Sequence, residues 1–156
     1  MADVAVRRMS PREPEAVQLL RASEEYLLSL YPPESAYLDS VPELALPHVA
    51  FFGAFARGEL VACGAVKRME DDGVYGEIKR VFVLPPARGR GLAKRIMAQI
   101  ESHAAGAGLS LLRLETGVHQ PEALALYRAL GYQERGRFGA YRLDPLSVFM
   151  EKSLSG

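Results

Sequence analysis

The order of apolar and polar residues divides the chain into short segments with two different periodicities. Alternating residues, or a short apolar run bounded by Gly or Pro, predict a β-strand, whereas apolar residues three and four apart predict an amphipathic helix. The predicted strands are Ala2–Met9, Val49–Phe55, Leu60–Arg68, Gly73–Leu84, Leu109–Glu115 and Ser147–Lys152. The predicted helices are Glu13–Leu30, one that opens within Ala87–Ala93 and ends at Gly106, and one from Pro121 to Leu130.

Proline and glycine mark the connections between these segments. Pro32 and Pro33 end the first helix, because proline removes a backbone donor and keeps the preceding residue out of helical angles. The stretch from there to Pro47 is expected to be a loop with a short helix. Arg57-Gly58 predicts a hairpin turn, and the segment Tyr132–Arg142 is expected to join the sheet before the final strand.

The element order is therefore β-α-(α)-β-β-β-α-β-α-β-β. Antiparallel hairpins come first and a βαβ crossover follows, which indicates a mixed α/β (α+β) fold. The strand Leu109–Glu115 is almost wholly apolar, as expected where both faces of a sheet are covered. No repeat or linker divides residues 1–156, so one domain is expected.

Composition limits the classes of partner. The chain has 19 Lys plus Arg and 19 Asp plus Glu, which gives formal neutrality. Nucleic acid and anionic membrane surfaces are therefore not expected as partners, since both select for net positive charge. Local Arg clusters in a neutral chain suit a small anionic ligand better than a polyanion.

Cysteine and terminal patterns point to a cytoplasmic protein without a metal centre. Cys63 is the single cysteine, so no internal disulfide can form. The three histidines show no metal-ligand spacing. The N-terminal residues lack the apolar run of a signal peptide, and no apolar run is long enough to span a bilayer.

The stretch Val83–Ala93 carries the strongest chemical signal. A strand ends at Pro85-Pro86, an Arg-Gly-Arg-Gly turn follows, and a helix begins. The first amides of a helix lack internal partners and lie at the positive end of its dipole, so they bind phosphate well. Glycine lets a bulky phosphate approach the backbone, and Arg88 and Arg90 add positive charge.

Other interpretations of this loop are open to comparison. A nucleotide-binding P-loop would need a Gly-Lys-Ser/Thr ending, which is missing. A dinucleotide fingerprint would need a third glycine where Lys94 stands. A plain helix start with packing glycines remains the structural alternative.

The whole array resembles the GNAT family of N-acetyltransferases. Its signature, Arg/Gln-x-x-Gly-x-Gly/Ala after a Val-x-Pro strand end, is satisfied by Arg88–Ala93. The run Ala123–Tyr132 (ALALYRALGY) is a second specific match, and the similarity extends over nearly the whole chain. Leu114–Gly117 and Phe138–Lys152 resemble a narrower bacterial subgroup, whose members are often labelled indole-acetate acetyltransferases.

The resemblance implies an acyl-CoA N-acyltransferase fold that binds acetyl-CoA. In that fold the strand before the loop and the strand after its helix splay apart, and the pantetheine arm fills the gap. Gln120 stands where the family usually has an Asn that contacts the arm. The cofactor-binding residues implied in this way are Val81, Phe82, Val83, Arg88, Gly89, Arg90, Gly91, Leu92, Ala93, Gln120 and Tyr127.

Acetyl transfer to an amine requires a base for the amine proton and an acid for the leaving thiolate. Tyr127 matches the family's tyrosine near the cofactor sulfur, and a phenol with a pKa of about 10 can protonate a thiolate with a pKa of about 8.5. Its alternative role is core packing, and both can hold together. Glu77 is the expected base, with a salt bridge to Lys79 as an equal alternative. Glu115 is the second choice for the base.

The acceptor is expected to contact the loop that begins at Tyr31 and the C-terminal segment, including Phe138 and Tyr141. Lys79 and Arg80 are unusual charges for a central strand, and with Arg137 they form a candidate carboxylate site. The alternative is that they reach solvent at the sheet edge. The substrate-binding candidates are Tyr31, Lys79, Arg80, Glu115, Phe138 and Tyr141.

Three functions are compatible with these patterns. A small-molecule N-acetyltransferase that works by direct attack in a ternary complex is the leading prediction, with a small amine as partner. A protein lysine or N-terminal acetyltransferase and a non-catalytic acyl-CoA binding module are the alternatives. A homodimer is an assembly that the sequence leaves open.

Overall fold

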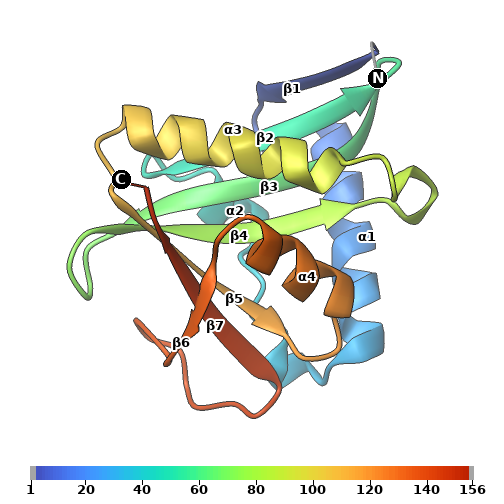
Figure 1. Ribbon diagram of the computed structural model, residues 1–156. Helices are drawn as coiled ribbons and strands as arrows, with labels where there is room; N and C mark the ends of the chain where they lie inside the picture. The colour runs from blue at the N-terminus through green and yellow to red at the C-terminus, as the bar shows by residue number, and fades with distance from the viewer. Residues whose placement is uncertain (1–2, 155–156) are drawn as a thin grey trace.

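The computed structural model describes residues 3–154, which form a seven-stranded mixed sheet in the order β1-β2-β3-β4-β5-β7-β6 (Figure 1). The strands are β1 (Val4–Arg8), β2 (Val49–Ala56), β3 (Glu59–Met69), β4 (Tyr75–Val83), β5 (Leu111–Gly117), β6 (Gln133–Arg135) and β7 (Ser147–Ser153). The helices are α1 (Pro14–Leu30), α2 (Val41–Leu44), α3 (Leu92–Gly106) and α4 (Pro121–Ala129), with 3-10 turns at Pro33–Ser35 and Pro85–Ala87.

The predicted mixed fold is confirmed. Strands β1 to β4 are antiparallel neighbours, and β4 pairs in parallel with β5 after the α3 crossover. The expected hairpin turn at Arg57-Gly58 joins β2 to β3, and both of its residues have positive φ (52° and 80°). Ala2, at the start of the first predicted strand, lies outside the described residues.

Helices cover both faces of the sheet (Figure 1). On one face, α3 and α4 bury a core that includes Ile96, Ile100 and Leu112. On the other face, α1 and α2 bury a second core that includes Leu20 and Leu44. Apolar residues three and four apart on α1 and α3 produce these buried stripes, as the sequence pattern indicated. None of the helices in residues 3–154 combines the length and apolar character needed to cross a membrane.

The C-terminal part of the sheet differs from the prediction. Of the segment Tyr132–Arg142, only the three residues of β6 are a strand, and β6 pairs with β7 at the sheet edge. The rest is a loop, because Phe138 turns inward and is buried against Tyr75 and Phe149. Extended pairing with β7 would remove Phe138 from this small aromatic core.

A β-bulge in β4, where it pairs with β3, accompanies the separation of β4 from β5. Ala65 of β3 pairs with Lys79 and Cys63 pairs with Phe82, so Arg80 and Val81 together face the single residue Gly64. Arg80 has a φ of 58°, and a bulge of this kind bends its strand and increases the local twist. The β4–β5 pairing accordingly stops at Ile78 and Leu114, whereas β5 stays paired with β7 as far as Gly117. The splay that the family resemblance implied is therefore present.

Candidate active site

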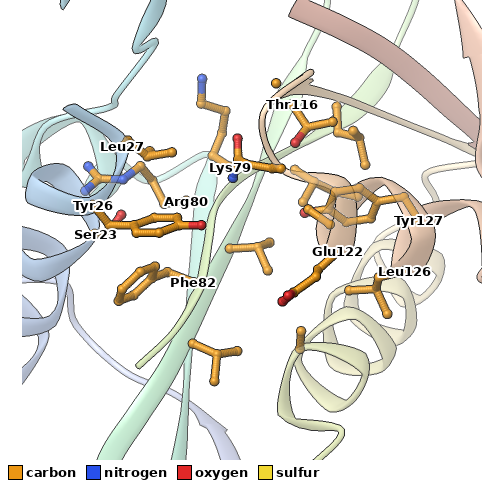
Figure 2. A pocket seen from close by; sticks show the side chains of 18 of the residues that line it. Ser23, Tyr26, Leu27, Lys79, Arg80, Phe82, Thr116, Glu122, Leu126 and Tyr127 are labelled. Carbon is orange, nitrogen blue, oxygen red and sulfur yellow. The ribbon is translucent and has the colours of Figure 1, made fainter. Parts of the chain in front are cut away.

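A cleft of about 480 Å³ lies where β4 and β5 separate. In Figure 2, Tyr26 and Phe82 lie on one side of it, and Tyr127, Leu126 and Glu122 lie on the other. The first side comes from α1 and β4, and the second comes from α4. One end is bounded by the Arg-Gly loop, and the other by the segment between α1 and α2.

Backbone amides form one end of the cleft. Gly89 and Gly91 have φ values of 81° and 72°, and the space where a side chain would begin is open at both residues. The first intrahelical bond of α3 runs from the Arg95 amide to the Gly91 carbonyl, so the preceding amides have no partner within the helix. No side chain caps this helix N-terminus, which leaves it available to an anion.

The two arginines of this loop lie in different places. The Arg88 Nε–H donates to the Val83 carbonyl at 3.0 Å, and the guanidinium lies over the Tyr26 and Phe82 rings at 4.8 and 5.7 Å from their centroids. Arg88 therefore joins the loop to α1 and lines the cleft. Arg90 is exposed and lies outside the cleft lining.

Tyr127 projects from α4 into the cleft (Figure 2). Its ring is buried and packs edge-on against Tyr132, with centroids 5.9 Å apart, so the predicted core packing is real. Burial and, secondarily, the nearby Glu115 carboxylate raise the pKa of the Tyr127 hydroxyl well above its usual value. The hydroxyl therefore keeps its proton at neutral pH, and Tyr127 lines the cleft.

Glu115 lies on β5 directly after the point where β4 departs. Burial raises the pKa of its carboxyl to about 7, against the opposing effects of a hydrogen bond from Ser147 and the charge of Lys79. The Ser147 hydroxyl donates to Glu115 Oε2 at 2.7 Å and fixes the carboxyl. A cleft carboxyl that titrates near neutral pH has the property that a general base requires.

Glu77, the expected base, has a different environment. The Tyr141 hydroxyl donates to its Oε2 at 2.5 Å, and Lys79 Nζ lies 3.8 Å from the same oxygen. Burial raises the pKa of Glu77, and Lys79 and Tyr141 oppose this shift. The predicted contact with Lys79 is therefore present, and Glu77 is not among the residues that line the cleft.

Lys79 and Arg80 are buried, so the expectation that they reach solvent at a sheet edge is wrong. The bulge places both side chains on the α1 face of the sheet, where both contact Asp39. Asp39 accepts from Lys67 at 2.8 Å and pairs with Lys79 at 2.9 Å, and its carbonyl accepts from Arg80. Burial opposes ionisation of Asp39, but the two lysines outweigh it and lower the pKa of its carboxyl.

Sequence reasoning missed Asp39. It lies in irregular backbone between the 3-10 turn and α2, outside any motif or periodic pattern. Arg137, the third member of the expected carboxylate site, is exposed and donates to the Tyr141 carbonyl at 3.2 Å. It is not among the residues that line the cleft.

Tyr31 crosses from the end of α1 to the β5–α4 loop. Its hydroxyl donates to Gln120 Oε1 at 3.1 Å and accepts from the His119 amide at 3.0 Å, and its ring stacks on His119. We call this set of contacts the Tyr31 strap. The side chain of Gln120, expected to contact the cofactor arm, is thus engaged by Tyr31. Tyr31 lines the cleft, as does Glu115. Burial raises the pKa of the Tyr31 hydroxyl, and the charge of Glu115 adds to this increase.

Phe138 and Tyr141 belong to the small aromatic core beneath the C-terminal loop. Phe138 packs edge-on against Tyr141 with centroids 5.2 Å apart, and Tyr141 lies similarly against Tyr37. Neither residue is among those that line the cleft. Tyr141 instead influences the cleft through Lys79 and Glu77, to which its hydroxyl is bonded.

Comparisons with known proteins agree with this architecture. Residues 15–132 match the model of the acetyltransferase (GNAT) family. The chain is 47% identical over 154 residues to an IAA acetyltransferase of Azospirillum brasilense, covering 99% of this chain and all of that protein. It is 31% identical over 116 residues to the N-alpha-acetyltransferase RimI of Mycobacterium tuberculosis, covering 73% and 72% of the two chains.

Solved structures show the same fold. An acyl-CoA N-acyltransferase structure from Klebsiella pneumoniae superposes with a TM-score of 0.82 at 36% identity, covering 99% of both chains. The PaiA N-acetyltransferase of Thermoplasma acidophilum in complex with coenzyme A has a TM-score of 0.75 at 18% identity, covering 96% and 98%. The chain belongs to the acetyltransferase (GNAT) family, which uses acetyl-CoA as co-substrate. It is an N-acetyltransferase.

The Tyr31 strap makes a prediction about Gly117. A Cβ at this position would lie 1.9 Å from the Tyr31 hydroxyl, so Gly117→Ala must displace the strap. We expect Gly117→Ala to lower the free energy of unfolding by about 1–3 kcal/mol, measured by chemical denaturation. In a Tyr31→Ala background the same change should cost less than about 0.5 kcal/mol, because the clash is gone. Equal costs in both backgrounds would show that the strap does not limit Gly117.

Proposed function

We propose that the protein transfers the acetyl group of acetyl-CoA directly to the amine of a small molecule, with both substrates bound in the cleft. The observation that carries this proposal is that the open amides of the α3 N-terminus, the Glu115 carboxyl and the Tyr127 ring border one cleft. The cleft therefore combines an anion site with a base and an acid.

The residues of the cleft fit acetyl-CoA. The pyrophosphate would lie against the amides that follow Arg88, where the glycines leave room. The pantetheine arm would pair with the backbone of Val81–Val83, since this part of β4 is not paired with β5. Acetyl-CoA supplies an activated acetyl group as a thioester, and the side chains of the cleft hold and move protons around it.

Glu115 is the proposed general base. It accepts a proton from the acceptor's ammonium group, and a carboxyl with a pKa of about 7 is much better matched to this task than an ordinary carboxyl at about 4.3. Glu77 is less suited, because Tyr141 occupies one of its oxygens and it does not line the cleft. We assign Glu77 instead to the positioning of Lys79.

Tyr127 is the proposed acid for the leaving thiolate. Its raised pKa keeps the hydroxyl protonated, and its hydrogen is not donated to any protein group that the structure describes. A thiolate that develops in the cleft would therefore find an available donor. The ring remains fixed by its packing on Tyr132, so the hydroxyl has a defined position.

Direct transfer is favoured over an acetyl-enzyme. Cys63 is fully buried and burial raises the pKa of its thiol to about 12, so it is not a nucleophile. His119 lies in the β5–α4 loop with its ring stacked on Tyr31. The Tyr31 strap and the segment Ser35–Leu38 border the end of the cleft opposite the Arg-Gly loop, where the acceptor would bind, and we call it the acceptor end. This enclosed end suits a small molecule better than a polypeptide. Among the relatives, the aminoalkylphosphonate N-acetyltransferase of Salmonella typhimurium is named for a small acceptor.

Coenzyme A binding tests the anion site. Gly91→Glu places a side chain and a negative charge at the helix N-terminus, and we expect coenzyme A affinity to fall about tenfold or more in isothermal calorimetry. Gly58→Glu is the matched control, because Gly58 has a similar φ of 80° but lies in the β2–β3 turn. Equal affinities of the two variants would contradict the assigned anion site.

The pH dependence tests Glu115. A base acts in its deprotonated form, so kcat/KM should rise with pH and level off above a midpoint near 7. Glu115→Gln should lower kcat/KM by about 10²–10⁴-fold and remove this midpoint. Glu77→Gln should keep it. A midpoint lost in Glu77→Gln and kept in Glu115→Gln would reverse the assignment.

Steady-state kinetics test Tyr127. The change Tyr127→Phe keeps the ring and its packing but removes the donated proton, so coenzyme A affinity should be unchanged while kcat falls by about 10²-fold or more. Tyr132→Phe is the control, since the Tyr132 hydroxyl donates to Glu101 outside the cleft. Unchanged kcat in Tyr127→Phe would remove the acid role.

A further inference from the structure

We propose that the acceptor is a primary amine on an uncharged, apolar body, of the arylalkylamine class, and that a carboxylate on the acceptor is rejected. This inference rests on the proposed function, since it concerns the acceptor half of the same cleft. It follows from which charges in that half are already paired and from what remains to face a substrate.

The Lys79 ammonium has no donor left for a substrate anion. It donates to Asp39 Oδ1 at 2.9 Å, to the Tyr141 hydroxyl at 2.9 Å and to the Tyr37 carbonyl at 3.4 Å. An ammonium has three N–H donors, so these contacts use all of them. Glu77, at 3.8 Å, adds further negative charge. Lys79 lines the cleft, but its charge is neutralised within the protein.

Arg80 is likewise committed to the protein. Its Nη1 donates to the Asp39 carbonyl, and its Nη2 donates to the Leu20 carbonyl at 3.1 Å and lies 3.5 Å from Glu24. The side chain is only 2% exposed, and its Nε is buried without a hydrogen-bond partner among the described residues. Arg80 borders the cleft, but both of its terminal nitrogens already bond to protein oxygens, so a carboxylate in the cleft would have to compete with these bonds.

The other cations near the cleft lie at its ends. Arg88 is at the amide end, where it bonds the Val83 carbonyl and stacks on Tyr26. Lys94 follows in the first turn of α3. Arg142 lies in the C-terminal loop, where it is exposed and donates to the Glu34 carbonyl. None of the three contacts Glu115 in the described contacts. The charge of Arg142 acts on Tyr37 and on Asp144, which is its counter-charge.

The negative groups point to a cationic acceptor. Glu115 faces the cleft and carries charge once deprotonated. Asp144 lies behind the segment that borders the acceptor end, where it accepts hydrogen bonds from Ser35 at 2.7 Å and Tyr37 at 2.9 Å. An ammonium is attracted to this environment, whereas a second anion beside Glu115 costs Coulomb energy that the already paired Lys79 offsets only in part.

The remaining lining determines the body of the acceptor. Leu27, Tyr31, Ala36, Tyr37 and Leu38 border this end, and none of them carries a charge. Two of the five are aromatic, and Tyr31 is held by its strap. An uncharged ring buries apolar surface here and can stack on a phenol. A second ammonium, as in a polyamine, would be desolvated among these uncharged side chains.

Matched acceptors test the proposal. Acetyl transfer to phenethylamine, phenylalaninamide, phenylalanine and spermidine would be followed by thiol release and by mass spectrometry of the products. Phenylalaninamide and phenylalanine have nearly the same shape and differ in charge, and we expect kcat/KM for the amide to exceed that for the acid by about tenfold or more. Phenethylamine should also exceed spermidine. Phenylalanine equal to its amide, or spermidine above phenethylamine, would overturn the proposal.

A variant of Asp39 tests the cause. Asp39→Asn removes the main counter-ion of Lys79, so a carboxylate on the acceptor should then be tolerated and the amide-to-acid ratio should fall severalfold. Glu70→Gln also removes one negative charge, but in an exposed pair with Arg68, and should leave the ratio unchanged. An unchanged ratio in folded Asp39→Asn would refute the counter-ion explanation. If Asp39→Asn does not fold, the amide-to-acid ratio of kcat/KM in the wild-type protein by itself tests the proposed acceptor class.

A wrong acceptor class and a wrong proposed function would give different experimental results. If the acceptor class is wrong, coenzyme A still binds and some amine outside the predicted class is acetylated faster. If the proposed function is wrong, no acetylated product is formed from any small amine, even where coenzyme A binds. A wider panel of small amines, assayed on the same protein sample, separates the two outcomes.

Discussion

The β-bulge at Arg80 and Val81 is the constraint on which the cleft depends. One extra residue in β4 breaks the register with β3 and bends the strand away from β5. The backbone of Arg80 has a φ of 58°, which costs about 1–3 kcal/mol for a residue that is not glycine. Arg80 offsets this strain with hydrogen bonds to two backbone carbonyls from α1 and the following loop. The same residue that opens the sheet therefore anchors the elements that cover it.

The bulge also explains why charged residues lie within a central strand. Consecutive strand residues normally face opposite sides, but the extra residue places Lys79 and Arg80 on one side together. Burying two cations requires counter-charges: Asp39 and Glu77 lie beside Lys79, and Glu24 lies 3.5 Å from Arg80. This network lies behind the acceptor end of the cleft. The charges of this network are paired with one another, and the titratable carboxyl of Glu115 lines the cleft.

Glu115 and Tyr127 illustrate how environment assigns chemistry. Both owe their raised pKa values first to burial, but the consequence differs for each group. A carboxyl moved to about 7 becomes an effective base at neutral pH, whereas a phenol moved upward becomes a permanent proton donor. Each group carries the protonation state that its proposed role needs, because each is desolvated in the same cleft.

Much of the site could be predicted from local sequence. The Arg88–Ala93 loop and the Tyr127 helix are continuous segments whose chemistry depends on backbone geometry and periodicity, and both line the cleft. The choice between Glu77 and Glu115 could not be made in this way. Both are acidic residues on neighbouring strands, and only Glu77 bonds to Tyr141, which lies more than sixty residues after Glu77 in the chain. Asp39 could not be found either, because its loop has no pattern.

The amino-acid sequence by itself determined the element order, the mixed sheet, the family and the amide loop, since these depend on periodicity and on contiguous motifs. Only the tertiary structure decided which carboxyl faces the cleft, which cations are neutralised and how Tyr31 spans from α1 to the β5–α4 loop. The physical reason is that burial and charge pairing depend on residues distant in sequence. A pKa or a free donor is a property of the packed surroundings, which no local pattern encodes.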